Sequence, residues 1–377
     1  MSIEISGLTR RFGRTEVLRG IDLSVGTGEL VALLGPSGSG KTTLLKIIAG
    51  LDWPDAGGMT VEGADWLAIE ARRRRIGFVF QHYALFPHMT VRDNLAFGLT
   101  VRPKAERPAP AAIRARVEEL LRFLQIPDLA GRYPAELSGG QRQRVALGRA
   151  LAIDPRILLL DEPFGALDAA VRRDLRRWLR GVHEASGTTT IFVTHDQEEA
   201  FELADRVVVL GEGRIEQVGT PDQIHDRPAS PFVARFLGAT VEVPVRIHAG
   251  RAERPGLDAA HLPRMATADG PGRLFLRPAE VAALEDAASP FRIAARHSTG
   301  ALVRLAVEDD AGAVAPFEIE LPRRAAPAGL APGARVRLRP EAGRLFPEPG
   351  AVLTRPDWQP PADAGARPAL QPKEFRQ

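Results

Sequence analysis

A glycine-rich segment near the start of the chain combines residue types that bind phosphate. It reads Gly35-Pro36-Ser37-Gly38-Ser39-Gly40-Lys41-Thr42-Thr43 and fits the pattern G-x-x-x-x-G-K-[ST]. It lies between an apolar run at 29–34, expected as a strand, and an expected helix at 41–49, which is the context the pattern requires. Glycines let backbone N–H groups turn toward phosphate oxygens, and the positive end of the helix faces the same charge. We predict that residues 35–43 bind nucleotide phosphates, that Lys41 reaches the β- and γ-phosphates, and that Thr42 offers its hydroxyl to Mg²⁺.

Two adjacent carboxylates follow a short apolar run in the middle of the chain. Ile157–Leu160 is continuously apolar, and Asp161 and Glu162 come next. Neighbouring residues of a strand point to opposite sides, so the two carboxylates are expected to have different roles. Asp161 suits Mg²⁺, directly or through water, and Glu162 suits the attacking water as a general base. An acid pair at a strand end is common, so this interpretation depends on its position after the phosphate loop.

A third segment, Leu137-Ser138-Gly139-Gly140-Gln141, places a serine and two glycines at the expected start of another helix. Such a helix start presents hydrogen-bond donors to an anion. The segment matches the signature of the ATP-binding cassette (ABC) ATPases, and the phosphate loop and the acidic strand flank it in that family's order. Residues 3–237 therefore resemble the ABC ATPases, which implies an ATP-hydrolysing P-loop domain.

The resemblance assigns roles to four more residues. Phe12 lies where the family stacks an aromatic ring on adenine. Gln81 matches the glutamine that senses Mg²⁺, the attacking water and the membrane subunit. His195 matches the switch histidine that contacts the γ-phosphate. Asp168, which ends Gly165–Asp168, matches the loop that touches the opposite protomer.

The resemblance also implies ATP and Mg²⁺ as cofactors and a head-to-tail homodimer. Each of two ATP molecules lies between the phosphate loop of one chain and the Leu137–Gln141 segment of the other. Glu162, His195 and Gln81 are then catalytic, and Thr42, Gln81 and Asp161 hold the metal. ATP favours the closed pair and hydrolysis releases it, provided that the γ-phosphate binds the closed state better.

Within this family, six segments resemble the sulfate/thiosulfate importer ATPases most: Phe78–Phe86, Met89–Val91, Arg107–Pro108, Arg132–Pro134, Arg176–Arg180 and Arg214–Pro221. Importers of molybdate, ferric iron, polyamines and sugars share parts of them. The resemblance implies two transmembrane permease subunits as partners, and a periplasmic or extracellular solute-binding protein that acts through them. It also implies a peripheral location at the cytoplasmic face of the inner membrane. His82, Tyr83 and Phe86 are expected near the groove that receives a permease helix.

The composition narrows the class of protein. The 377 residues include 50 Lys and Arg against 47 Asp and Glu, a net charge of +3 that is too even to indicate a nucleic acid partner. The absence of cysteine excludes disulfides, thiolate metal sites and a cysteine nucleophile. No signal peptide is visible at Met1–Arg11, and no apolar run approaches the ~20 residues of a membrane-spanning helix. Any transport role therefore requires a membrane partner.

The elements that must position these residues indicate two domains. Residues 1–237 are expected to form the α/β P-loop domain, with strands buried on both faces of a parallel sheet at 29–34, 76–80, 157–160 and 190–193. Amphipathic helices are expected at 113–124 and 171–182, with their apolar stripes in the core, and a hairpin at 207–218.

The pattern changes after Gly238. Residues 238–349 are expected to form a small all-β domain, an OB-like barrel with strands at 241–247, 274–277, 291–295, 302–307, 317–321 and 336–339. Related importers use such domains for dimer contacts or regulation. Arg277, Arg296 and Arg304 are candidates for binding a regulatory anion, and the competing interpretation is that they are solvated strand residues. Residues 350–377 are rich in proline and alanine and are expected to be a disordered tail.

Alternative functions and one departure from the family pattern remain. A soluble ABC ATPase of translation or DNA repair would usually carry two cassettes or a long coiled-coil insertion, and a regulator without turnover would not need Glu162 and His195. An importer of another solute stays open, because an ATPase subunit does not touch the solute. Gly148 stands where the family usually has alanine, and glycine in a helix costs ~1 kcal/mol relative to alanine. We expect a small effect on stability there and none on activity.

Overall fold

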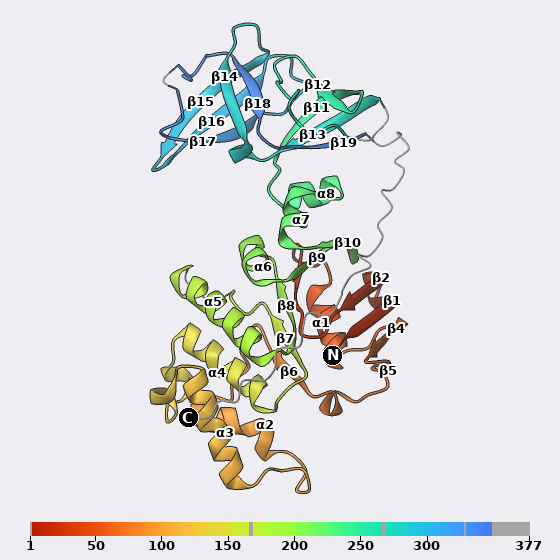
Figure 1. Ribbon diagram of the computed structural model, residues 1–377, viewed down its shortest axis with the longest axis vertical. Helices are drawn as coiled ribbons and strands as arrows, with labels where there is room; N and C mark the ends of the chain where they lie inside the picture. The colour runs from red at the N-terminus through yellow and green to blue at the C-terminus, as the bar shows by residue number, and fades with distance from the viewer. Residues whose placement is uncertain (1, 166–168, 266–268, 328, 349–377) are drawn as a thin grey trace. The chain divides into compact units, whose positions relative to one another are not determined.

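The computed structural model describes residues 2–165, 169–265, 269–327 and 329–348 (Figure 1). The chain divides into two compact units, Met1–Ala239 and Thr240–Gln377. The proposed tail at 350–377 lies outside the described residues. Within the described part of the chain, no helix is both long and apolar enough to span a membrane.

A six-stranded sheet forms the centre of the first unit, with the strand order β10-β9-β3-β8-β7-β6. The strands from β9 to β6 run parallel, and β10 pairs antiparallel with β9, which confirms the expected parallel core and hairpin. The strands are β3 (Leu30–Leu34), β6 (Ile76–Val79), β7 (Ile157–Asp161), β8 (Thr189–Thr194), β9 (Arg206–Gly211) and β10 (Arg214–Gly219).

Each face of this sheet has its own apolar core, and β3 contributes to both. Leu30, Ala32 and Leu34 pack with the helices α2 to α6 on one side. Val31 and Leu33 pack with α1 (Lys41–Ala49) and the N-terminal strands on the other. The continuous apolar runs in the sequence thus come from alternating side chains that are buried on opposite faces.

Helices cover one face of the sheet in Figure 1. The amphipathic stripe of α3 is buried as expected, from Ile113 to Leu124. In α5, Leu175, Leu179 and Val182 are buried, but Val171 is 38% exposed, so the predicted stripe begins one turn too early. The helices are α2 (Val91–Thr100), α3 (Pro110–Phe123), α4 (Gly139–Ala152), α5 (Ala169–Ser186), α6 (Gln197–Leu203), α7 (Pro221–Asp226) and α8 (Pro231–Phe236), with short 3-10 turns at Ala71–Arg73, Pro127–Leu129 and Pro134–Glu136.

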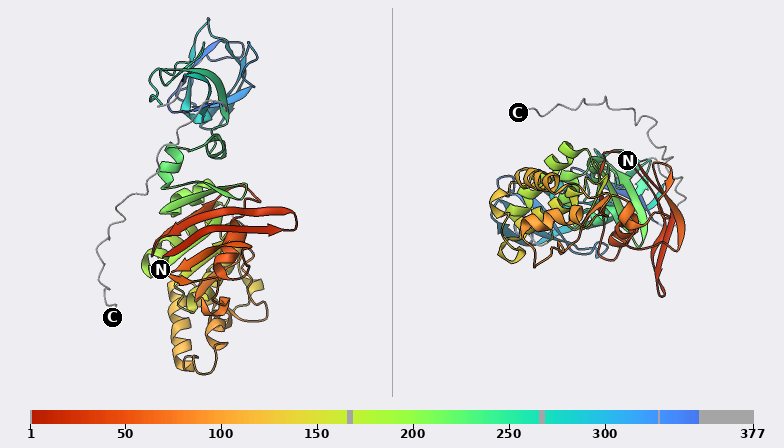
Figure 2. Two further views of the ribbon diagram at one scale, coloured as in Figure 1. Left: turned by 90° about the vertical axis from the view of Figure 1, so that its right-hand side faces the viewer. Right: turned by 90° about the horizontal axis from the view of Figure 1, so that it is seen from below.

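A second sheet of the first unit was not expected from the sequence. Its antiparallel strands follow the order β2-β1-β4-β5, and the long β1–β2 hairpin stands out in Figure 2. One face of the sheet is buried and the other is exposed to solvent, so buried Ile3 and Ile5 alternate with exposed Glu4 and Ser6 at the start of β1. The strands are β1 (Ile3–Phe12), β2 (Thr15–Val25), β4 (Ala56–Val61) and β5 (Ala64–Asp65).

The second unit is built of antiparallel strands around one apolar core. Three sheets have the orders β12-β11-β13-β19, β14-β18 and β15-β16-β17. All six expected strands are present, and β12, β14 and β19 are additional. The elements are β11 (Val241–His248), β12 (Arg251–Glu253), β13 (Gly270–Leu276), a 3-10 turn (Pro278–Glu280), β14 (Val281–Glu285), β15 (Phe291–Thr299), β16 (Leu302–Asp309), β17 (Phe317–Pro322), β18 (Val336–Pro340) and β19 (Arg344–Pro347).

The position of Gly148 corrects the expectation that glycine is a small stability cost there relative to alanine. Gly148 is buried in α4, and a Cβ atom would lie 2.3 Å from Leu124 Cδ1 and 2.6 Å from Leu95 Cδ2. The glycine therefore allows close approach of side chains from two neighbouring segments, and the cost of glycine in a helix is offset by packing.

Candidate active site

The phosphate-loop candidate connects the buried strand β3 to the helix α1. Gly38 and Gly40 have positive φ angles of 81° and 97°, which glycine adopts without strain. A Cβ at Gly35 would lie 2.3 Å from the Leu210 carbonyl oxygen, so only glycine fits there. The helix begins at Lys41 after Gly40, which has no side chain to cap its first N–H groups. Those groups remain donors for an anion.

The C-terminal end of α1 is fixed by Gly50 and by Arg74, which no sequence pattern marks. The helix ends at Gly50, as expected, with a φ angle of 76°. The buried Arg74 donates from Nη1 to the carbonyl oxygens of Ile47 and Ile48, at 2.9 Å each. A cation that binds the last carbonyls of a helix also complements its dipole. Arg74 therefore fixes the C-terminal end of α1, and the N-terminal end of the same helix carries the last residues of the phosphate-loop candidate.

Lys41 and Ser39 are buried in the loop. The Lys41 ammonium group donates to the carbonyl oxygens of Gly35 and Pro36 at 2.8 Å each and lies 3.4 Å from Ser39 Oγ. Burial lowers the pKa of Lys41, and the carboxylates of Glu162 and Asp161 oppose that shift. The lysine is thus a desolvated cation with acidic neighbours, which is suited to attract a multivalent anion.

The side chain of Thr42, in the first turn of α1, contacts Asp161 at the end of β7. Thr42 Oγ1 donates to Asp161 Oδ1 at 2.8 Å. Burial raises the pKa of Asp161, and the hydrogen bond from Thr42 opposes that shift. These hard oxygen donors fit Mg²⁺, which proteins hold through one or two carboxylates together with substrate phosphates. Among the described residues, no group of three or more His, Cys, Asp and Glu side chains could form an all-protein metal site.

Two of the predicted residues lie beside the carboxylate of Glu162. Gln81 Nε2 donates to Glu162 Oε2 at 2.8 Å, and His195 Nδ1 lies 3.5 Å from Glu162 Oε1. Gln81 follows β6 and His195 follows β8, so the carboxyl ends of parallel strands bring these residues to one edge of the sheet. Open α/β sheets bind ligands at this edge.

The geometry of Glu162 corrects the expected reason for the separation of the two carboxylates. β7 ends at Asp161, and Glu162 has a φ angle of 45°, outside the strand. Its N–H group donates to the Val193 carbonyl oxygen at 3.1 Å. A left-handed turn, not the alternation of a strand, therefore separates the two carboxylates. A positive φ in glutamate is uncommon and indicates a constrained position.

The remaining predicted residues lie elsewhere. Phe12 ends β1 with its ring exposed and the Arg10 guanidinium 4.7 Å from the ring centroid. Thr43 is part of the first turn of α1. Asp168 lies outside the described residues, so its predicted contact has no structural description.

The signature segment begins α4, which stands apart from α1 in Figure 1. Ser138 Oγ accepts from the N–H of Gln141 at 3.3 Å, and Gln141 Oε1 accepts from the N–H of Ser138 at 2.9 Å, which is a capping box. Leu137 is buried, whereas Gly139 and Gly140 are partly exposed. A Cβ at Gly140 would lie 2.9 Å from Val171 Cγ1 of α5.

The segment after Gln81 is held by two residues that no sequence pattern marks. Arg149 of α4 donates to the carbonyl oxygens of Tyr83 and Ala84 at 3.1 and 2.7 Å. The buried Asn94 accepts from the N–H of Phe86 at 2.9 Å and donates to backbone carbonyl oxygens. Their partners are backbone groups, and no local sequence pattern marks such contacts.

The chain matches known protein families in both units. Residues 18–165 match the family model described as "ABC transporter", and residues 285–341 match a TOBE-like domain. The sulfate/thiosulfate import ATP-binding protein CysA of Bradyrhizobium diazoefficiens is 53% identical over 348 residues, which cover 92% of this chain and 99% of that protein. The proteins of that name from Methylococcus capsulatus and Brucella melitensis are 52% and 50% identical and cover 92% and 94% of this chain, and 99% and 98% of their own length.

Solved structures resemble the first unit. The dimeric structure of a post-hydrolysis state of the ATP-binding cassette MJ0796, bound to ADP and Pi, has a TM-score of 0.53 and 33% identity. It covers 58% of this chain and 98% of that one. The fold, the strand-end arrangement and the matching family model define an ATP-binding cassette of the ABC transporter class. Within that class, the chain belongs to the family of sulfate/thiosulfate import ATP-binding proteins.

Proposed function

We propose that this chain is the ATP-hydrolysing subunit of an ABC importer that takes up sulfate or thiosulfate. The convergence of Gln81 and His195 on Glu162, beside the Thr42–Asp161 pair, carries the proposal of hydrolysis. The choice of solute rests on the names of relatives that are 50–53% identical over more than nine-tenths of the chain.

Binding of ATP is assigned to residues 35–43 and Phe12. The backbone N–H groups of the glycine-rich loop and the start of α1 surround the phosphates, and Lys41 exchanges its carbonyl partners for phosphate oxygens. The exposed ring of Phe12 offers a stacking surface for adenine. Mg²⁺ bound with ATP, held by Thr42, Gln81 and Asp161, supplies charge neutralisation at the phosphates.

Hydrolysis is assigned to Glu162, Gln81 and His195. Glu162 accepts the proton of the attacking water as a general base. Gln81 donates to the Glu162 carboxylate and so orients it, and His195 lies on its other oxygen. His195 is 59% exposed, which leaves its imidazole accessible to the γ-phosphate of a bound nucleotide.

The signature segment is proposed to bind the ATP that a second copy of the chain holds in its own glycine-rich loop. Leu137–Gln141 begins a helix that stands apart from the phosphate loop, so the head-to-tail homodimer accounts for a second anion-binding helix start. The structures of MJ0796 that resemble this chain are dimeric. Asp168 is proposed to touch the opposite protomer near this interface.

Two transmembrane permease subunits are the proposed membrane partners, with a solute-binding protein acting through them. The segment after Gln81 is the proposed contact, because Arg149 and Asn94 hold it on two helices that can transmit movement. His82 is exposed there, whereas Tyr83 is buried and the ring of Phe86 packs at a tilted angle against the ring of Phe97. We therefore propose that the protein works at the cytoplasmic face of the inner membrane.

For the second unit we propose dimer contacts or regulation. The three arginines considered for anion binding have partners within the unit. Arg277 and Arg304 pair with Glu280 and Glu320 at 2.9 Å each, and Arg296 donates to two backbone carbonyl oxygens. These contacts favour a structural role for the three side chains.

The decisive test is the ATPase activity of the complex reconstituted with its permease subunits. Solute-binding protein loaded with sulfate or thiosulfate should stimulate hydrolysis, whereas binding protein loaded with molybdate should not. Stimulation only by the binding protein loaded with molybdate would mean that molybdate is the solute, and the protein would still be the ATPase subunit of an ABC importer. The absence of any ATP hydrolysis under all three conditions would refute the enzymatic assignment.

A further inference from the structure

The hydroxyl group of Thr194 ties together the backbone on both sides of His195. Thr194 is the last residue of β8, and Asp196 is the N-cap of α6. Thr194 Oγ1 donates to Glu199 Oε2 at 2.5 Å and accepts from the N–H of Asp196 at 3.0 Å. The residues before and after His195 are therefore joined through one side chain.

His195 needs such support because its own side chain is exposed and lies 3.5 Å from Glu162. Thr194 and Glu199 are buried instead, at 1% and 4% exposure. Burial raises the pKa of Glu199, and the hydrogen bond from Thr194 opposes that shift. A buried polar group that loses its partner costs free energy, so the pair constrains the local backbone.

Arg172 of α5 anchors this network from outside. Its Nη1 lies 3.3 Å from Asp196 Oδ2, and its Nε lies 3.8 Å from Glu199 Oε1. The Asp196 carboxylate also accepts from the N–H groups of Glu198 and Glu199, at 2.8 and 3.3 Å. Arg172 thus faces both carboxylates that fix the first turn of the helix after His195.

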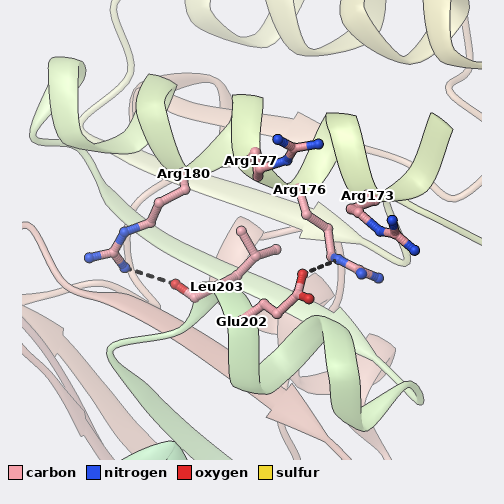
Figure 3. A pocket seen from close by; sticks show the side chains of 6 residues that line it. All are labelled: Arg173, Arg176, Arg177, Arg180, Glu202 and Leu203. Atoms are coloured by element: carbon pink, nitrogen blue, oxygen red, sulfur yellow. Dashed lines mark hydrogen bonds and ion pairs between the residues drawn. The ribbon is translucent and has the colours of Figure 1, made fainter. Parts of the chain in front are cut away.

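Two further arginines of α5 continue the same attachment. Arg172, Arg176 and Arg180 are four residues apart and share one face of the helix; we call them the arginine row. Arg176 donates to Glu202 at 2.6 Å and to Glu198 at 3.0 Å, and Arg180 donates to the Leu203 carbonyl oxygen at 2.8 Å. Figure 3 shows the contacts of Arg176 with Glu202 and of Arg180 with Leu203. The row therefore holds α6 along its length.

We propose that Thr194, Glu199 and Arg172 are positioning residues for ATP hydrolysis, which place His195 beside Glu162. This inference rests on the proposed function. A displaced catalytic group lowers turnover more than it lowers binding of the product nucleotide, because orientation matters most in the reacting complex.

The first test compares two threonines of β8 in the full chain, reconstituted with its permease subunits. Thr194→Val should lower kcat for ATP by ~10- to 10²-fold and leave ADP affinity unchanged, and Thr194→Ser should restore most of the activity. Thr190→Val is the matched control, since Thr190 is 0% exposed on the same strand and its hydroxyl contacts the Thr188 carbonyl oxygen and His183 Nδ1, away from His195. Equal kcat in the two valine variants would overturn the proposal.

A double-mutant cycle separates positioning from general stability. In a His195→Ala background, Thr194→Val should change kcat by less than ~2-fold, since both act through the same group. A further loss as large as in the wild-type background would show that Thr194 does not act through His195. Arg172→Met should also lower kcat, with Arg177→Met on the same helix, 72% exposed, as control. A wild-type complex without turnover would instead refute the proposed function.

Discussion

Gln81 and Glu162 are 81 residues apart in the sequence, and their side chains meet at 2.8 Å. The amide of Gln81 can only donate to this carboxylate through Nε2, and it donates to Glu162 Oε2. The other carboxylate oxygen, Glu162 Oε1, faces His195. The carboxylate is thus oriented by groups that follow β6 and β8, the two parallel strands on either side of β7. Movement of either strand end would change the position of the proposed general base.

The role of Glu162 can be tested by removing its charge. Glu162→Gln should retain ATP binding and lose at least ~10²-fold in turnover, the lower end of what a general base supplies. Hydrolysis by the reconstituted complex and ATP binding by the full chain are the measurements. Glu212→Gln is a matched control, because Glu212 is exposed and also has a positive φ, of 46°. Near-normal hydrolysis by Glu162→Gln would exclude it as the base.

Lys41 should matter for binding itself. Lys41→Ala removes the cation of the phosphate loop, and ATP affinity should fall at least ~10-fold, because hydrogen bonds from charged groups contribute ~1.5–3 kcal/mol. Titration of the purified full chain with ATP measures this effect. The exposed Lys104 provides the control variant Lys104→Ala, which should bind as the wild type does. Unchanged affinity in Lys41→Ala would mean that the loop does not hold the phosphates.

Asp161 should limit stability at high pH. Burial raises its pKa in the folded protein, so the folded state holds the proton more tightly than the unfolded state. Its contribution to stability therefore falls as the pH rises from the unfolded pKa through the folded one. Without nucleotide or Mg²⁺, Asp161→Asn should raise Tm, and by more at pH 8 than at pH 3.5, which lies below the ordinary aspartate pKa of ~3.9, while Mg²⁺-dependent turnover is lost. An equal Tm difference at both pH values would contradict this account.

Two helical glycines should respond to alanine in opposite directions. Gly148→Ala should gain ~1 kcal/mol of helix propensity but lose ~1–3 kcal/mol to overpacking against Leu124 and Leu95, a net destabilisation of up to ~2 kcal/mol. Gly181, in the interior of α5, has open space around it. Gly181→Ala should therefore stabilise the protein by ~1 kcal/mol. Chemical denaturation of both variants measures the difference, and stabilisation by Gly148→Ala would show that the leucines yield freely.

The sequence by itself determined the features that consecutive residues encode. The helix from Lys41 to Ala49 after the glycine-rich segment and the strand that ends at Asp161 were both readable, because each depends on local backbone preferences and periodic burial. The antiparallel N-terminal sheet was missed, since an alternating pattern does not reveal which strands pair.

Only the tertiary structure decided which of these segments meet. The strand order β3-β8-β7-β6 brings Thr42 to Asp161, and both Gln81 and His195 to Glu162. The left-handed turn at Glu162 and the support of His195 by Thr194, Glu199 and Arg172 likewise appear only in the folded chain. The physical reason is that strand order and buried polar contacts depend on how the whole chain excludes water, whereas a sequence motif records only its own neighbours.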